Sequence, residues 1–349
     1  MPAEEVFDVT VIGGGPAGLY STFYSGLREM KTKLIEYQPT LGGKINVYPE
    51  KMIWDVGGLE ATTGEQLMNQ LIKQGLTFNP EVKLNEKITS ITRDENGMFI
   101  LHGASGGEKH YSKTVIIAIG SGILKPKKLT IDQADQFTNL NYTVKSLSHF
   151  VDRTVLVSGG GNSAIDWANE LEPIAKKIYF TCRKDVLKGH EAQASQLQNS
   201  SIECFFNTSI SDLISHTGKQ AIDQVELTNH KTGEVSYVKV DEVIVNHGYE
   251  QDNSLLKNSP LGFSLKDDFF ISGDSLSQSS VDGLYAAGDI LAYNGKVNLI
   301  AGAFQDAANA VNQAKQFIQP DATSAGMVSS HNDVFKQRNK RLIKQLARK

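Results

Sequence analysis

Short apolar segments of strand length recur along the chain, and a glycine-rich turn follows two of them. Val6–Val11 runs into Gly13-Gly14-Gly15-Pro16-Ala17-Gly18, and a helix-compatible pattern begins at Leu19. Thr154–Ser158 repeats the arrangement, with Gly159-Gly160-Gly161-Asn162-Ser163-Ala164 and then a helical pattern. Strand, tight turn and helix in this order predict βαβ units. We therefore expect an α/β fold with two Rossmann-like dinucleotide-binding domains.

Both turns fit the pattern GxGxx(G/A). Its glycines allow a sharp turn and bring backbone N–H groups and a helix N-terminus against a pyrophosphate. One copy would be weak evidence, but two copies in the required context are strong. The residues expected to contact phosphate are Gly13, Gly15, Pro16, Ala17 and Gly18 at the first site, and Gly159, Gly161, Asn162, Ser163 and Ala164 at the second.

The residue 23 positions after the first glycine of each turn indicates which nucleotide binds. At the first site it is Glu36, whose carboxylate can accept hydrogen bonds from ribose hydroxyls and repels a 2′-phosphate. At the second it is the neutral Cys182, with the cations Arg183, Lys184 and Lys188 just beyond. Cations without an opposing anion suit a 2′-phosphate. We expect FAD or NAD at the first site and NADP at the second.

A third element completes the first domain. Gly283–Asp289 reads as a short strand, and residues 298–314 form a helical run rich in alanine. Asp289 stands where a carboxylate can hold the ribityl chain of a flavin, and the dipole of the following helix favours negative charge on the reduced ring. The FAD domain is then discontinuous, over residues 1–123 and 281–349, with an NADPH domain inserted at 124–280. Paired connections of this kind suit a hinge.

Composition excludes several classes of protein. A chain of 349 residues allows about two domains. The longest apolar stretches, such as Thr114–Ile119, are far too short for a membrane helix, and no basic segment precedes the first strand, so we expect a cytoplasmic protein that binds no membrane. The two cysteines cannot form a CxxC pair, and the eight histidines lack the spacing of a metal motif, so no metal is expected.

Charge is concentrated at the C-terminus. The last fifteen residues carry seven cations and no acid, so the rest of the chain has a net charge of −11 against −4 for the whole. An acidic body disfavours nucleic acid as a partner. Phe335, Leu342 and Leu346 have near-helical spacing. These last fifteen residues are expected to form either a solvated helical end or a docking patch for an acidic protein.

With these motifs the sequence resembles the flavoproteins with two dinucleotide-binding domains, among them the low-molecular-weight thioredoxin reductases. The redox CxxC of those enzymes is missing, because Tyr142–Lys145 contains no cysteine. The chain is more similar to the ferredoxin–NADP reductase family of thioredoxin-reductase type. The shared segments are YPEK (Tyr48–Lys51), GGGNSAxDWA (Gly159–Ala168), LEPIAKK (Leu171–Lys177) and a C-terminal extension.

This resemblance implies a homodimeric oxidoreductase with FAD and NADPH as cofactors. A hydride would pass from NADPH to flavin N5, and single electrons would leave for ferredoxin or flavodoxin, with no side chain required as acid or base. Tyr48 would stack on one face of the flavin, and His331 of the partner subunit would cover the other. Further FAD contacts are expected at Gly43, Lys44, Gly120 and Asn309. Where relatives have Pro-Thr after an acid, this chain has Asp306-Ala307-Ala308-Asn309.

Two alternatives share these motifs. One is a flavoprotein sensor or scaffold without fast turnover, and the other is a diverged thioredoxin-reductase-like enzyme with another acceptor. Fast reduction by NADPH followed by fast electron export would separate the reductase from the sensor.

Overall fold

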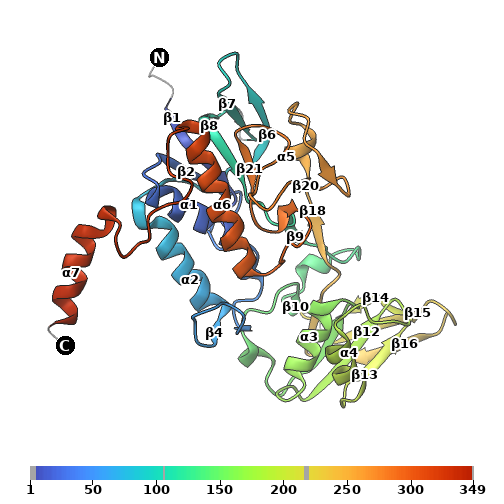
Figure 1. The fold of residues 1–349 in the computed structure, drawn as a ribbon. Coiled ribbons are helices and arrows are strands. Elements are labelled where there is room, and N and C mark those ends of the chain that lie inside the picture. Colours follow the sequence, from blue (N-terminus) through green and yellow to red (C-terminus); the bar gives the residue numbers. More distant parts are fainter. Residues whose placement is uncertain (1–4, 105–106, 216–219, 348–349) are drawn as a thin grey trace. The chain divides into compact units, whose positions relative to one another are not determined.

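A computed structural model describes residues 5–104, 107–215 and 220–347 of the chain (Figure 1). The chain forms two compact units. Unit 1 comprises Met1–Asn46, Lys51–Gly122 and Asp252–Lys349, and unit 2 comprises Val47–Glu50 and Ile123–Gln251. One dinucleotide-binding motif lies in each unit.

The sheet of unit 1 has the strand order β5-β2-β1-β8-β7-β6, and β21 also pairs with β8. Its strands are β1 (Val6–Ile12), β2 (Thr32–Ile35), β5 (Glu81–Lys83), β6 (Ile88–Arg93), β7 (Phe99–Gly103), β8 (Lys109–Ile117) and β21 (Leu284–Ala286). The pairs β1–β2, β1–β8, β2–β5 and β8–β21 are parallel, whereas β6–β7 and β7–β8 are antiparallel. Ile12 is in register with Ile35 and Ile117, and Ile117 with Ala286, so four strands end level at one edge.

Two long helices cover this sheet because their apolar faces pack onto it and onto each other (Figure 1). The helices of unit 1 are α1 (Pro16–Leu27), α2 (Gly64–Gly75), α5 (Ser254–Lys257), α6 (Ile300–Ile318) and α7 (Lys336–Leu346). Its 3-10 turns are η1 (Gly43–Val47, ending in unit 2), η2 (Leu76–Phe78), η5 (Gly288–Ile290) and η6 (Asp333–Phe335), and its small strands are β3 (Met52–Ile53), β4 (Thr62–Thr63), β19 (Leu265–Lys266), β20 (Phe270–Ser272) and β22 (Leu291–Ala292). The long helices α1 and α6 pack against each other.

Unit 2 is built around a parallel sheet of order β10-β17-β11-β12-β13. These strands are β10 (Leu140–Asn141), β11 (Thr154–Ser158), β12 (Lys177–Cys182), β13 (Glu203–Phe206) and β17 (Glu242–Val245). Ser158 is in register with Thr181 and with Val245, so β11, β12 and β17 end at one edge.

The other elements of unit 2 surround that sheet. They are the helices α3 (Asn162–Leu171) and α4 (Glu191–Gln198), the 3-10 turns η3 (Ala134–Gln136) and η4 (Leu147–Phe150), and the antiparallel strands β14 (Thr208–Ile214), β15 (Gln224–Asn229) and β16 (Val235–Lys239). Where the inserted segment begins and ends, β9 (Ile123–Pro126) and β18 (Tyr249–Gln251) pair antiparallel.

The α/β class and the interrupted order of the first domain agree with the sequence prediction, but both boundaries of the inserted segment differ from the predicted ones. The chain enters unit 2 at Ile123, one residue before the predicted position, and returns to unit 1 at Asp252 rather than at Val281. Residues 252–280 belong to unit 1 because Leu255, Leu256 and Ile271 are buried in its hydrophobic core.

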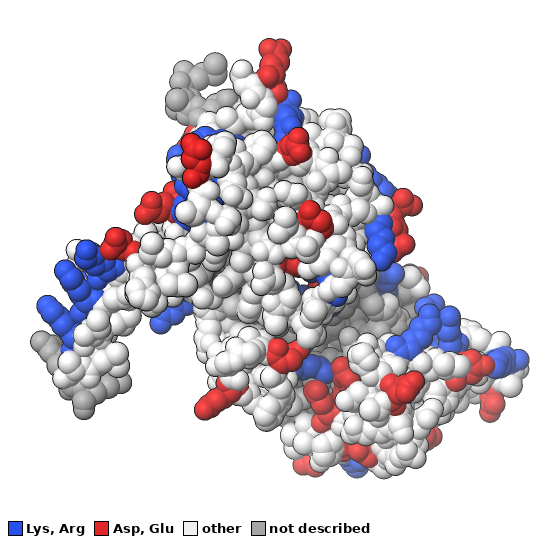
Figure 2. All heavy atoms as spheres, viewed as in Figure 1, with Lys and Arg blue, Asp and Glu red and all other residues white. Residues whose placement is uncertain are grey.

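The C-terminal segment ends in the helix that its spacing predicts. Phe335 precedes α7 and packs on the rings of Phe23 and Phe78, with centroids 6.4 and 5.4 Å apart. Beyond it, Leu342 and Leu346 are exposed, and Figure 2 shows basic side chains gathered along α7. None of the helices between residues 5 and 347 has the length and apolar character needed to span a bilayer.

Candidate functional site

The carboxyl edge of the unit 1 sheet carries the first glycine-rich turn. Gly13 N donates to Ile35 O over 2.8 Å, and α1 begins at Pro16 with no acidic residue in its first turn. A Cβ placed on Gly18 would lie 1.7 Å from Gly13 O, so only glycine permits this close approach of helix and turn. The first turn of α1 thus contributes no negative charge of its own, which suits an anion at the helix N-terminus.

Glu36 lies at the end of the neighbouring strand, with its side chain directed at this turn. Its two carboxylate oxygens accept hydrogen bonds from Gly14 N at 2.5 Å and Gln38 N at 2.7 Å. The residue is 7% exposed, and burial raises the pKa of its carboxyl group. The carboxylate that the sequence predicts as a ribose acceptor is thus fixed beside the glycine-rich turn.

A second segment folds over the same turn. Gly42 N donates to Gly14 O over 2.8 Å. Gly43 has a φ of +59°, and a Cβ on it would lie 2.7 Å from the Cα of Gly15. The close contact of these two glycines brings the exposed Lys44 to the predicted FAD site.

The ends of β8 and β21 complete this edge. Ala118 N bonds to Ile12 O, and Ala287 N bonds to Ile117 O, so Gly120 and Asp289 follow directly from the same edge. Asp289 is half-buried in η5. Immediately ahead of α6, the apolar side chains of Val297 and Leu299 are 52% and 49% exposed. An apolar surface and a carboxylate on the same connection suit a ring system joined to a polyol, and in this respect the residues fit FAD.

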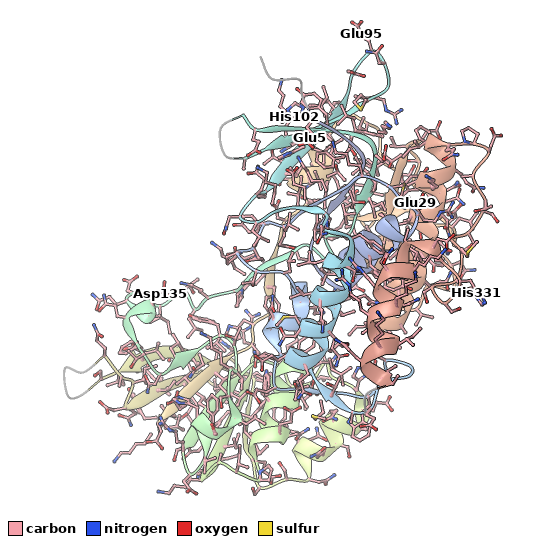
Figure 3. All side chains as sticks on the ribbon, turned by 90° about the vertical axis from the view of Figure 1, so that its left-hand side faces the viewer. Glu5, Glu29, Glu95, His102, Asp135 and His331 are labelled. Carbon is pink, nitrogen blue, oxygen red and sulfur yellow. The ribbon has the colours of Figure 1, made fainter. Side chains whose placement is uncertain are left out.

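The remaining predicted flavin contacts have other partners in this structure. Asn309, on α6, donates from its side-chain amide to Ser275 O at 2.8 Å. Tyr48 is half-buried against the hydrophobic core of unit 2. His331 is exposed, lies within 3.1 Å of the Ser330 hydroxyl, and is seen at the periphery in Figure 3. Their roles at the flavin stay predictions.

The carboxyl edge of the unit 2 sheet repeats this design. Gly159 N donates to Thr181 O over 2.9 Å, and α3 begins at Asn162, again with no acid in its first turn. Nothing lies within 4 Å of a Cβ placed on Gly161, which leaves room for a phosphate. The side-chain amide of Asn246, directly after β17, has a buried Oδ1 for which the described residues supply no hydrogen-bond partner. The open turn and the unpaired acceptor fit a bound nucleotide.

The three predicted cations lie at this edge. Lys188 N donates to Gly160 O over 2.7 Å, which holds Lys188 beside the glycine-rich turn. Arg183 and Lys184 follow β12 and are exposed. Cys182 is buried, and a Cβ on Gly160 would lie 2.4 Å from its Sγ. The structure therefore brings the neutral residue and the cations to the turn, as a 2′-phosphate site requires.

Sequence reasoning missed two features of this edge. Asp185 stands among the cations, and Lys231 Nζ lies 2.8 Å from it. This ion pair lowers the pKa of the Asp185 carboxyl group, and the ammonium group of Lys231 offsets the negative charge of the carboxylate. His247, two residues after β17, lies with Nε2 2.9 Å from Ser158 Oγ, and burial together with the charge of Arg183 lowers its pKa. A prediction of β17 beside β11 would have drawn attention to His247.

Comparison with known proteins identifies the family to which this chain belongs. The family described as "Pyridine nucleotide-disulphide oxidoreductase" matches residues 7–314. The chain belongs to this family. The resemblance drawn from the two glycine-rich motifs is thereby confirmed at family level.

Relatives named as ferredoxin–NADP reductases are closely similar over their full length. "Ferredoxin--NADP reductase 1" of Bacillus mycoides (strain KBAB4) is 68% identical over 348 residues, 99% of each chain. "Ferredoxin--NADP reductase 2" of Exiguobacterium sibiricum is 63% identical with the same coverage. The crystal structure of Lactococcus lactis thioredoxin reductase superposes with a TM-score of 0.71 and 24% identity over 89% of this chain and 99% of its own, which supports the fold.

The family name refers to disulphide chemistry, and the cysteines of this chain do not suit it. Cys182 and Cys204 are both free and lie on the neighbouring strands β12 and β13. Cys182 pairs with Phe206, and Cys204 with Phe180, so the two residues are not opposite each other. Burial raises the pKa of the Cys204 thiol, which disfavours its reactive thiolate.

Proposed function

We propose that this protein is an FAD-containing, NADPH-dependent reductase that passes electrons to a small acidic redox protein, ferredoxin or flavodoxin. The observation that carries the proposal is the pair of unlike nucleotide edges. One presents the carboxylate of Glu36, and the other presents Arg183, Lys184 and Lys188 around a neutral Cys182. The names of its full-length relatives support ferredoxin as the acceptor.

In this proposal unit 1 holds FAD. Backbone N–H groups of the first turn and the start of α1 face the pyrophosphate, Glu36 accepts from the adenosine ribose, and Asp289 accepts from the ribityl chain. Unit 2 holds NADPH, with its pyrophosphate at the start of α3 and its 2′-phosphate among the cations. Bound flavin supplies the chemistry, because it accepts a hydride and releases electrons singly. The side chains bind and orient, and none is needed as an acid or base.

A dithiol acceptor is disfavoured by the two cysteines described above, so we propose one-electron carriers rather than thioredoxin. We also propose a cytoplasmic homodimer. In that dimer Tyr48 stacks on the flavin, and His331 of a second copy covers its other face. Since a covered flavin face is closed to nicotinamide, hydride transfer then requires a hinge movement or displacement of the C-terminal segment.

Anaerobic stopped-flow mixing tests the proposal. The purified yellow protein is mixed with NADPH or NADH, and the reduced protein is then mixed with oxidised ferredoxin, flavodoxin or thioredoxin. We expect fast bleaching of the flavin band by NADPH, much slower bleaching by NADH, and rapid reoxidation by ferredoxin or flavodoxin. Slow bleaching, or reoxidation by neither carrier, would contradict the proposal and favour a sensor. Fast reoxidation by thioredoxin alone would favour a diverged thioredoxin-reductase-like enzyme.

A further inference from the structure

A buried ion pair lies next to the predicted flavin contact Asp289. Asp306, in the second turn of α6, is 1% exposed, and the Lys296 side chain is 6% exposed. The Asp306 carboxylate accepts hydrogen bonds from Lys296 Nζ, from the Tyr293 hydroxyl at 3.1 Å and from Gly288 N at 3.1 Å. We propose that this cluster positions the flavin-binding turn and that its balance of charge sets the midpoint potential of bound FAD.

The cluster determines the path of the chain between β21 and α6. Gly288, Tyr293 and Lys296 are three points of that connection, and all three bond to the same carboxylate. Gly288 has a φ of +77°, and a Cβ on it would lie 2.9 Å from the Cβ of Ala17. The turn is thus held between the first turn of α1 and the carboxylate on α6. Asp289 and the start of α6, the two elements predicted to meet the flavin, are its neighbours in the chain.

The charges of the cluster indicate an electrostatic role in addition to a structural one. Two buried charges lose their hydration, and apolar residues of similar volume often hold a chain at least as well. Charged groups here do what apolar groups cannot, because they contribute an electric field at the adjoining site. Lys296 lies four residues before α6, whose N-terminal dipole has the same sign as its ammonium group. Asp306 opposes both.

Because the two charges have opposite signs, removing each one should shift the midpoint potential of bound FAD in a different direction. Asp306→Asn keeps the shape of the side chain but leaves the Lys296 cation unopposed, so the more negative reduced flavin is favoured and the potential rises. Lys296→Met leaves the Asp306 anion unopposed, so the potential falls. Asp306→Asn with Lys296→Met removes both charges, so the potential returns toward that of the parent protein. A cluster that acted only by holding the chain would not give shifts of opposite sign.

The experiment measures the midpoint potential of each holoprotein by anaerobic equilibration with reference dyes, and the Kd of FAD for each apoprotein. We expect at least a tenfold change in the ratio of affinities for oxidised and reduced FAD in each single variant, about 30 mV for a two-electron couple, with opposite signs. Asp8→Asn and Lys113→Met are matched controls, because this pair of a half-buried aspartate and an exposed lysine lies at the amino end of β1, away from Gly13. Both should leave the potential unchanged.

Shifts of the same sign in the two single variants, or no shift in either, would overturn the inference. If Asp306→Asn does not fold, Lys296→Met and the double variant decide, since a lowered potential that the double variant does not restore also contradicts it. The inference rests on the proposed FAD site, and the two fail differently. A parent apoprotein that does not bind FAD overturns the proposed function, whereas tight binding with unshifted potentials overturns the inference alone.

Discussion

Glu36 follows the end of β2, and its carboxylate bonds to the turn after β1, so it connects the two strand ends at the proposed adenosine site. Its carboxylate already accepts two backbone N–H groups, so a bound ribose would add to an ordered acceptor rather than organise a mobile one. Preorganisation of this kind lowers the cost of binding. The raised pKa is the consequence of burying that carboxylate, and it makes the site sensitive to mild acid.

We therefore expect FAD binding to weaken as the pH falls through the raised pKa of Glu36, above the ordinary value near 4.5. Below that pKa the carboxyl group is protonated and loses acceptor capacity, and above it the full affinity is present. Glu36→Gln should bind FAD about ten- to a hundredfold more weakly at neutral pH, as expected for a lost charged hydrogen bond of about 1.5–3 kcal/mol, and should lose the pH dependence. FAD titration of the apoprotein at several pH values measures both effects. Glu95→Gln, in an exposed turn, should behave as the parent protein, and an unchanged pH profile in Glu36→Gln would contradict the assignment.

Arg183 and Lys188 are positioned at the second site by different parts of the backbone. Arg183 follows the end of β12, whereas backbone pairing of Lys188 with Gly160 fixes the other cation. Arg183→Ala and Lys188→Ala should each raise the KM for NADPH about tenfold or more, because a charged hydrogen bond to the 2′-phosphate is lost. The KM for NADH should change little. Steady-state kinetics with both coenzymes test this.

Lys177→Ala is the matched control, since Lys177 stands at the opposite end of β12 from Arg183 and forms an ion pair with Glu203. It should leave both constants unchanged. Equal losses with NADPH and NADH in the Arg183 and Lys188 variants would place these cations outside a 2′-phosphate site.

The helices α1, α2 and α3 differ in how the backbone N–H groups of their first turns are satisfied. The helices α1 and α3 begin without a capping side chain, whereas α2 begins with a capping box. In that box the Thr63 hydroxyl accepts from Gln66 N at 3.2 Å, and Gln66 Oε1 accepts from Thr63 N at 3.3 Å. An N-terminus already filled by its own residues has no need of an anion.

Thr63→Ala should therefore lower the free energy of unfolding by about 0.5–2 kcal/mol and leave coenzyme kinetics unchanged. Thermal or denaturant unfolding of the holoprotein measures the loss. Thr77→Ala, which removes a hydroxyl that donates to Lys73 O in the last turn of α2 at 3.3 Å, is the control and should cost less. A change in the KM for NADPH in Thr63→Ala would contradict a purely structural role for α2.

At the scale of elements, strand, turn and helix could be predicted wherever a short apolar run met a glycine-rich turn, because local chemistry determines both. This holds for β1 with α1 and for β11 with α3. Residues 252–280 could not be assigned, since Leu255, Leu256 and Ile271 join the unit 1 core through long-range packing that leaves no periodic pattern. The Asp306–Lys296 contact is of the same kind, because only the folded connection brings the two charges together.

Charge is distributed unevenly over the whole molecule, and this distribution bears on the proposed carrier. The last fifteen residues are strongly basic while the rest of the chain is net acidic. In α7 the apolar side chains of Leu342, Ile343 and Leu346 are 55–71% exposed, so this helix presents both charge and apolar surface. Phe335 anchors its start on Phe23 and Phe78, and the helix beyond that anchor can be altered without disturbing the core.

Replacing the cations Lys336, Lys340, Arg341 and Lys344 by Gln should lower the second-order rate of electron transfer to an acidic carrier about tenfold at low ionic strength, because steering of the carrier is lost. Arg338 stays, since it also contacts Thr77 and Phe78. The difference from the parent protein should vanish as added salt screens the charges, the Debye length falling from about 10 Å at 0.1 M to about 3 Å at 1 M. Stopped-flow reoxidation by ferredoxin at increasing salt measures it.

The matched variant replaces Leu342, Ile343 and Leu346 by Gln and retains every cation. If charge recruits the carrier, this variant keeps the salt dependence of the parent protein, and both variants are reduced by NADPH at the parental rate. If instead the apolar variant alone slows reoxidation, α7 acts through its apolar face. Parental rates for carrier and NADPH in both variants, and after deletion of residues 336–349, would leave α7 as a solvated end of the chain with neither a docking nor a gating role.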